Sequence, residues 1–67
     1  MTEPYDYQEV SNWFLNDEGL HDLARSSNSG TELYELCNDF GIFEVGQGVR
    51  LTRENVAYSW RCVMGEE

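Results

Sequence analysis

Carboxylates are the most numerous groups in this chain that can carry out chemistry. The 67 residues include 13 Asp and Glu, four Arg and no Lys, and the formal net charge is −9 at pH 7. Carboxylates act as general acids and bases, ligate metal ions, or form a negative surface that repels nucleic acid and attracts basic proteins. Their spacing decides which of these roles the sequence supports.

The sequence contains no pattern that catalysis or metal binding requires. The single histidine, His21, has carboxylates beside it but no nucleophile, which predicts a solvated surface histidine. No HExxH, GxSxG, phosphate-binding glycine loop or EF-hand pattern occurs. The acids between Asp17 and Asp22 lie in no loop that supplies the about six to eight oxygens of a calcium site. We therefore expect no enzyme, no metal and no cofactor.

Three acids occupy one side of a predicted helix over residues 29–40. Glu32, Glu35 and Asp39 follow i, i+3, i+7, within about 60° of arc and away from the centre of the apolar stripe. In this pattern Tyr34 projects roughly opposite the apolar centre. Exposed tyrosine beside carboxylates is typical of interface cores, and the alternative for Tyr34 is a side chain half-buried at the edge of a small core. The helix is therefore expected to present a binding face.

A second acidic row lies on the preceding predicted helix. Glu18 and Asp22 are spaced i, i+4, and Asp17 adjoins them. Like charges at this spacing destabilise a helix by about 0.2–0.5 kcal/mol each, so a row kept at that cost indicates a use. The predicted partner is a basic protein or ribonucleoprotein complex. The predicted partner-binding residues are Asp17, Glu18, Asp22, Glu32, Glu35, Asp39 and Tyr34.

The negative charge is also compatible with two origins that need no partner. Any surface helix has a solvated face, which is usually charged. Proteins of a high-salt cytoplasm are acidic and poor in lysine over their whole surface. Here residues 55–65 contain no acid, and Arg50, Arg53 and Arg61 lie in the C-terminal third, so the charge is uneven and favours a directed surface. Four arginines are too few for direct binding of nucleic acid.

Local signals predict the helices that position these acids. Asp6 and Glu9 have capping-box spacing at the start of a helical region from about 7 to 25. This region either bends or divides near 16–18, where Asn16 or Asp17 could cap a second segment. Gly19 costs about 1 kcal/mol inside a helix but little in the first turn of a new one, which favours two segments.

The helix over 29–40 carries signals at both ends. Ser29 has the position of an N-cap, and Gly41 fits the left-handed conformation that ends a helix. The apolar side of this helix is predicted to contain Leu33, Leu36, Cys37 and Phe40.

A short hairpin and a last helix complete the expected fold. Apolar and polar residues alternate over 42–51 on both sides of Gly-Gln-Gly, which predicts a hairpin with a glycine-containing turn. Thr52 is expected to cap the last helix. The buried stripe of that helix is predicted to be Val56, Ala57, Trp60 and Val63.

These elements define an α+β fold, a mostly helical small single domain over residues 1–67 with frayed ends near 1–5 and 65–67. Its order is three N-terminal helical segments, a β-hairpin and a C-terminal helix. The first ten residues have no signal-peptide pattern, and no apolar run is long enough to span a bilayer, so we expect a soluble, cytoplasmic protein. Cys37 and Cys62 are predicted to be buried, reduced thiols.

The chain resembles small acidic phage-encoded inhibitors, namely anti-CRISPR proteins and other nucleic-acid mimics. The resemblance lies in size, charge and layout over the whole chain, and is carried by the acids of 17–22 and 32–39 and by the segment FEVGQGVRLTRENV. It implies a protein that occupies a basic channel of a host complex, with carboxylates in place of the phosphates of DNA or RNA.

A second hypothesis belongs to a different class. A chain of this size has a small core, and a lone two-stranded hairpin is marginal in water, so the hairpin or the last helix is a candidate dimer interface. On this hypothesis the protein is a homodimeric regulatory or adaptor module, similar to an antitoxin, and the acidic charge mainly serves solubility.

Overall fold

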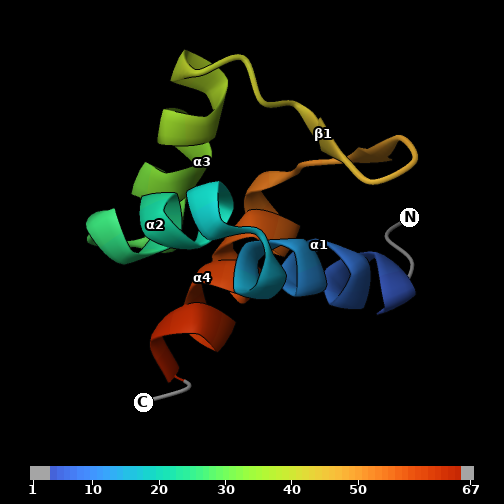
Figure 1. Ribbon diagram of the computed structural model, residues 1–67, viewed down its shortest axis with the longest axis horizontal. Helices are drawn as coiled ribbons and strands as arrows, with labels where there is room; N and C mark the ends of the chain where they lie inside the picture. The colour runs from blue at the N-terminus through green and yellow to red at the C-terminus, as the bar shows by residue number, and fades with distance from the viewer. Residues whose placement is uncertain (1–3, 66–67) are drawn as a thin grey trace.

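The structure, a computed structural model, describes residues 4–65 of the chain (Figure 1). Side chains are described from Tyr7 onward. The arrangement confirms a mostly helical α+β fold with a single antiparallel hairpin in the described part of the chain. The elements, in order, are α1 (Pro4–Asn16), α2 (Glu18–Ser26), α3 (Gly30–Asp39), β1 (Glu44–Val45), β2 (Val49–Arg50) and α4 (Arg53–Gly65).

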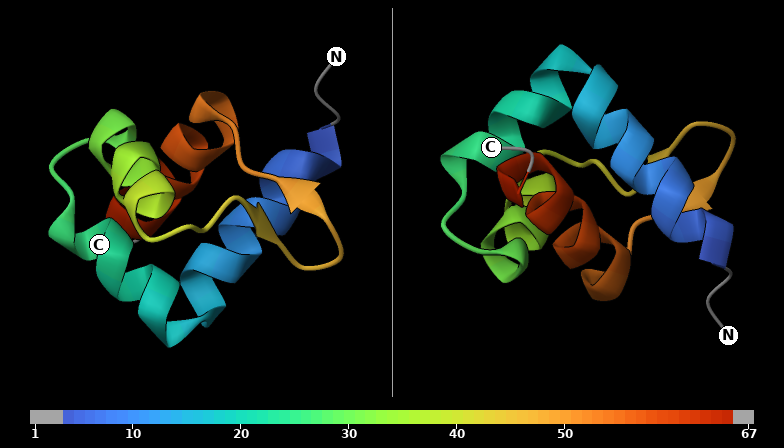
Figure 2. Two further views of the ribbon diagram at one scale, coloured as in Figure 1. Left: turned by 90° about the horizontal axis from the view of Figure 1, so that it is seen from above. Right: turned by 90° about the horizontal axis from the view of Figure 1, so that it is seen from below.

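The last helix is the centre of the packing. The first three helices are arranged around α4, which contacts each of them (Figure 2). The hairpin lies beside α1, and its strands pair Glu44 with Arg50 and Val45 with Val49. Because each strand has only two residues, the hairpin depends on these neighbouring helices for its stability.

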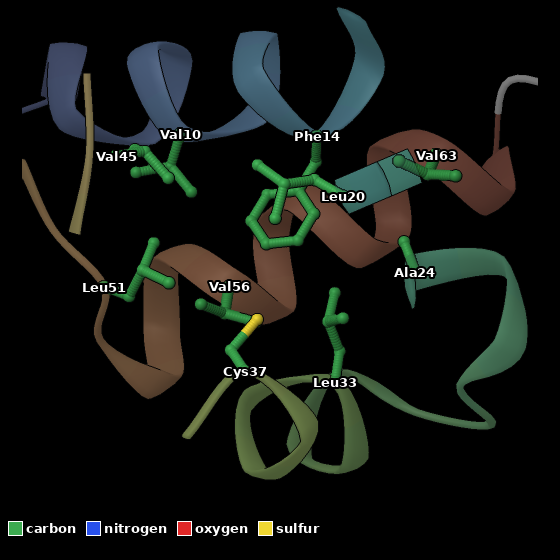
Figure 3. Close-up of a cluster of buried hydrophobic side chains, with 10 residues drawn as sticks. All are labelled: Val10, Phe14, Leu20, Ala24, Leu33, Cys37, Val45, Leu51, Val56 and Val63. Carbon is green, nitrogen blue, oxygen red and sulfur yellow. The ribbon is translucent and has the colours of Figure 1, made fainter. Parts of the chain in front are cut away.

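One hydrophobic cluster joins all four helices and the hairpin (Figure 3). The largest fully buried side chain is Phe14, whose ring points from α1 into the middle of the cluster. Burial of a side chain of this size contributes about 1.5–3 kcal/mol. The buried hydrophobic residues are Val10, Phe14, Leu20, Ala24, Leu33, Cys37, Val45, Leu51, Val56 and Val63.

The N-terminal region divides into two helices, as the two-segment prediction requires. Asp17 is the N-cap of α2, and its side chain accepts a hydrogen bond from the backbone N–H of Leu20 at 3.1 Å. The backbone N–H of Asp17 still donates to the carbonyl of Trp13 at 2.8 Å. One residue therefore closes α1 and starts α2, and the chain changes direction there.

The predicted cap at the start of the chain is wrong. The backbone is already helical at Pro4, so Asp6 lies inside α1 and is not its N-cap. Proline suits a first helical turn because its fixed φ matches the helix and its missing N–H has no helical partner there. Of the expected frayed ends, residues 1–3 and 66–67 lie outside the described residues, and Gly65 belongs to α4.

Both predicted ends of α3 are confirmed. The Ser29 hydroxyl accepts a hydrogen bond from the backbone N–H of Glu32 at 3.1 Å. At the other end Gly41 has a φ of +76°, which a residue with a side chain rarely adopts. The backbone N–H groups of Gly41 and Ile42 donate to the carbonyls of Asn38 at 3.0 Å and Cys37 at 2.8 Å. These two bonds form a Schellman motif, which turns the chain sharply away from α3.

A buried asparagine connects the hairpin to α4. The side chain of Asn55, 2% exposed, accepts from the backbone N–H of Thr52 at 2.8 Å and donates to the carbonyl of Arg50 at 2.9 Å. In return the Thr52 hydroxyl accepts from the backbone N–H of Asn55 at 3.1 Å. The predicted Thr52 cap is therefore confirmed, with asparagine in the position that a capping box usually gives to Glu or Gln.

The buried stripe of α4 is only partly as predicted. Val56 and Val63 are buried, but Ala57 and Trp60 are half-buried. Asn55 and Ser59 take the remaining central positions because both satisfy their polar groups locally, Ser59 by donating to the carbonyl of Asn55 at 2.8 Å.

Replacing Asn55 by Ala should destabilise the fold more than any other single polar substitution in the described chain. The change leaves the Thr52 N–H and the Arg50 carbonyl without their partner, at a cost of about 2–4 kcal/mol in the free energy of unfolding. Urea denaturation measures the effect. Asn38→Ala, at an exposed position, is the control and should stay within about 0.5 kcal/mol of the wild type. Equal midpoints for the two variants would contradict the role of Asn55.

Helices α3 and α4 approach each other closely at Gly30. A Cβ atom on Gly30 would lie 2.6 Å from Cα and 2.7 Å from Cβ of Ala57. Carbon atoms that are not bonded to each other do not come this close. Helix α3 can therefore pack this closely against α4 only because position 30 has no side chain. This contact fixes which side of α3 faces the core.

Gly30→Ala should therefore destabilise the protein even though alanine is the better helix former. We expect a loss of about 1–3 kcal/mol from the forced separation of α3 and α4, which exceeds the helix gain of up to about 1 kcal/mol. Gly19→Ala is the matched control, because Gly19 also lies in a first turn and its added Cβ would be 3.4 Å from the nearest atom. That variant should be neutral or stabilised in thermal unfolding. A stabilised Gly30→Ala would show that the two helices separate freely.

Candidate binding surface

The acidic row of α3 lies on the outward side of that helix. Glu35 and Asp39 are exposed, and Glu32 is half-buried, with its carboxylate accepting from the backbone N–H of Asn28 at 3.0 Å. The buried side of α3 is formed by Gly30, Leu33 and Cys37. The centre of the acidic row is about 160° from the centre of this buried side. The three carboxylates therefore face away from the core, and α3 has no basic residue beside them.

The acids of α2 are also on an outward side, with a different balance of charge. Glu18 and Asp22 are exposed, while Asp17 is half-buried and its side chain caps the helix. The exposed Arg25 follows Asp22 by three residues and lies on the same side of α2. The α2 row therefore contains a compensating charge, whereas the α3 row contains none.

Tyr34 takes the second of the two predicted positions, at the edge of the core, and does not project away from it. It is half-buried against the hydrophobic cluster, and the Arg53 guanidinium lies over its ring, 5.5 Å from the ring centroid. The reason is the contact of Gly30 with α4, which moves the buried side of α3 towards Tyr34. Apolar periodicity cannot show this, because glycine contributes no side chain to the pattern. Tyr34 thus joins α3 to α4 through its contact with Arg53.

Phe40, predicted as part of the core, is instead 63% exposed. It is the C-cap of α3, and the Schellman turn after it carries the chain away from α4. Phe43 is 57% exposed just before β1. The other exposed large apolar side chains in the described chain, Trp13, Tyr58 and Met64, are only 36–37% exposed. The Phe40–Phe43 segment is therefore the most exposed apolar part of the surface, and sequence periodicity gave no sign of it.

His21 is not the solvated surface histidine that the sequence predicts. It is half-buried, and its Nδ1 lies 3.2 Å from the carbonyl oxygen of Phe14. Carbonyls in the last turn of a helix lack an intrahelical partner, so the imidazole supplies one where α1 ends. This contact gives His21 a structural role at the α1–α2 junction.

A shallow hollow lies along the outer side of α1, lined by Asn12, Trp13, Asn16 and Asp17. Its polar side chains are two amides, the Trp13 indole, which donates to the Glu9 carboxylate at 3.3 Å, and the Asp17 carboxylate, which caps α2. Within residues 4–65, no three His, Cys, Asp or Glu side chains converge to hold a metal ion. None of the described helices is long and apolar enough to cross a membrane.

Neither cysteine takes part in a disulfide. Cys37 is 1% exposed, and burial raises the pKa of its thiol from 9.0 to about 11. Cys62 is half-buried on α4, so it is less enclosed than predicted. Since the thiolate is the reactive form, Cys37 is chemically inert in the folded protein.

Comparison with known proteins adds no relative, because no protein family, curated protein or solved structure matches this chain.

The two thiols should differ in reactivity towards 5,5′-dithiobis(2-nitrobenzoic acid) at pH 8. We expect Cys62 to react at least tenfold faster than Cys37, which should react only when the protein unfolds. Cys62→Ser should remove the fast phase, and Cys37→Ala should leave it unchanged. Equal rates for both thiols would contradict the burial of Cys37.

The Cys37 thiol should make the free energy of unfolding depend on pH above neutrality. Between pH 9 and about 11 the unfolded thiol loses its proton while the folded Cys37 keeps it. The unfolded state then binds fewer protons, so the free energy of unfolding falls as pH rises through this range. Denaturation curves at pH 8 and pH 10.5 should show a smaller decrease for Cys37→Ala than for the wild type.

Proposed function

We propose that this chain is an acidic inhibitor that binds the basic surface of a nucleic-acid-handling protein or ribonucleoprotein complex. Its carboxylates stand in for phosphates, as in the anti-CRISPR-like and nucleic-acid-mimic proteins that the sequence resembles. The chain acts by steric and electrostatic competition for an Arg/Lys-rich channel, without enzymatic activity or cofactor. In this proposal it acts in the cytoplasm of the host cell and does not itself bind nucleic acid or membrane.

The observation that carries the proposal is the uncompensated acidic row of α3. Glu35 and Asp39 are exposed on the side of the helix that faces away from the core, at the spacing of successive turns. Two arginines have other neighbours than this row: Arg53 lies over the ring of Tyr34, which is at the border of the core, and Arg50 is opposite Glu44 in the hairpin. The negative charge of α3 is therefore available to a partner.

Exposed carboxylates give this interaction a definite dependence on salt. Their field extends over about 8–10 Å at physiological ionic strength and steers a basic partner towards the surface. Added salt shortens that range, so it slows association more than it speeds dissociation. A purely apolar interface would not show this pattern.

Neutralising the α3 row should weaken partner binding, whereas removing the same charge elsewhere should not. The test variant is Glu35→Gln/Asp39→Asn, which keeps the shape of each side chain. The charge-matched control is Glu9→Gln/Glu54→Gln, on α1 and α4 and outside the α3 row. Each immobilised protein is incubated with host-cell lysate at low salt and eluted with a salt gradient.

We expect the wild type and the control to retain a basic nucleic-acid-binding complex that excess double-stranded DNA displaces. The α3 variant should lose at least 90% of it, or release it at a clearly lower salt concentration. Equal retention by all three proteins would contradict the role of α3, and recovery of the chain alone would contradict the proposed function. Circular dichroism establishes that each variant remains folded.

A further inference from the structure

We propose that the corner formed by residues 39–44 is the apolar anchor of the binding surface, and that it takes a basic protein surface carrying an apolar pocket. The inference rests on the proposed function and names the part of the surface that fixes the partner in place. Charges at the rim of an interface give speed and specificity, whereas buried aromatic side chains supply most of the binding energy.

The first argument is the exposure of two phenylalanines on an ordered backbone. Phe40 and Phe43 are 63% and 57% exposed, and their Cα atoms, three positions apart in the chain, lie at most about 10 Å from each other. The backbone N–H of Ile42 donates to the carbonyl of Cys37 at 2.8 Å, and that of Leu51 donates to the carbonyl of Phe43 at 2.9 Å. The segment is therefore held at both ends. A partner that binds it loses little free energy to ordering of the chain.

The second argument is the position of this corner in the molecule. Figure 1 shows the C-terminal end of α3 and the segment after it at the edge of the molecule, away from α4. Ile42, between the two phenylalanines, packs against the core, and Val45 is buried in it. Inward residues thus fasten the segment, and the two aromatic rings remain outside. Folding alone gives no reason for two large apolar side chains to be exposed there.

The third argument is the charge around the rings. Asp39 precedes Phe40 in the last residue of α3, where the negative end of the helix dipole makes an acid unfavourable and no basic residue compensates it. Glu35 is one turn earlier on the exposed side, and Glu44 follows Phe43. Glu44 is opposite Arg50 across the hairpin, so the uncompensated charge is on the α3 side of the corner. The apolar rings are therefore bordered by negative potential on that side.

This charge decides between a basic partner and a second copy of the chain. In a symmetric dimer built on Phe40 and Phe43, the same patch meets itself, so Asp39 and Glu35 would approach the equivalent acids of the other copy. Like charges facing each other in an interface cost several kcal/mol. A partner with Lys or Arg around an apolar pocket meets complementary charge instead. The corner therefore favours a basic heterologous partner.

Two defined peptides separate the apolar from the electrostatic contribution. One is a 20-residue helical peptide with lysine on one face and leucine on the other, and the second is 20-residue oligolysine. Isothermal titration calorimetry at low salt measures both against the wild type and against Phe40→Ser/Phe43→Ser. We expect the double variant to bind the lysine–leucine peptide at least tenfold more weakly and oligolysine within twofold of the wild type. The single variants Phe40→Ser and Phe43→Ser should show intermediate losses.

Matched variants make failure of this inference distinct from failure of the proposed function. Met64→Ser removes an exposed apolar side chain from α4 and should leave both affinities unchanged. Unchanged binding of the lysine–leucine peptide to the phenylalanine variants would overturn the anchor while leaving the acidic surface intact. If the α3 charge variant bound both peptides as tightly as the wild type does, the proposed function would be overturned. A wild-type dimer that becomes a monomer in Phe40→Ser/Phe43→Ser, measured by sedimentation equilibrium, would overturn the choice of a basic partner.

Discussion

The placement of both α4 and the hairpin depends on the buried side chain of Asn55. It holds the Arg50 carbonyl, where the hairpin ends, and the Thr52 N–H, where the last helix begins. The hairpin is too short to be stable alone, and α4 is the helix that the other three surround. One amide therefore sets the angle between the two parts of the molecule. Its cost of burial is small because each of its polar groups has a backbone partner.

The structure reconciles an extreme negative charge with a small core. The buried residues of the described chain include no Asp or Glu, and none of the buried side-chain N or O atoms there lacks a hydrogen-bond partner. Repulsion between the carboxylates is therefore a surface effect, which salt weakens. Stability then rests on close packing, such as the approach of α3 to α4 at Gly30. Most of the carboxylates thus lie outside the packing that stabilises the fold.

Charge and apolar surface meet at the end of α3. The outward row leads along that helix to Asp39, and the turn at Gly41 presents Phe40 and Phe43 next to it. Binding to the carboxylates alone would be readily reversed by salt. Binding to the two rings alone would not distinguish a basic partner from any other apolar surface. On the proposed function, the carboxylates would select a basic partner by charge, and burial of the two aromatic side chains would retain it.

Features that depend on neighbours along the chain could be predicted from residue types and spacing. The caps at Asp17, Ser29 and Thr52 and the left-handed Gly41 need only local hydrogen bonds and a permitted φ, so their residue types predict them. The hairpin follows from alternation and a glycine-containing turn for the same reason. The cap at Asp6 was wrong because the signal of Pro4 starts α1 earlier.

Which sides of the elements are covered depends instead on tertiary packing. The close approach at Gly30 sets the rotation of α3, which places Tyr34 at the border of the core, while the turn after α3 leaves Phe40 outside. His21 acquired its backbone partner, the carbonyl of Phe14, where α2 turns back against the end of α1. Periodicity gives the spacing of a helical face, but the face that is buried depends on which other helix comes closest, and that is a property of the whole packed chain.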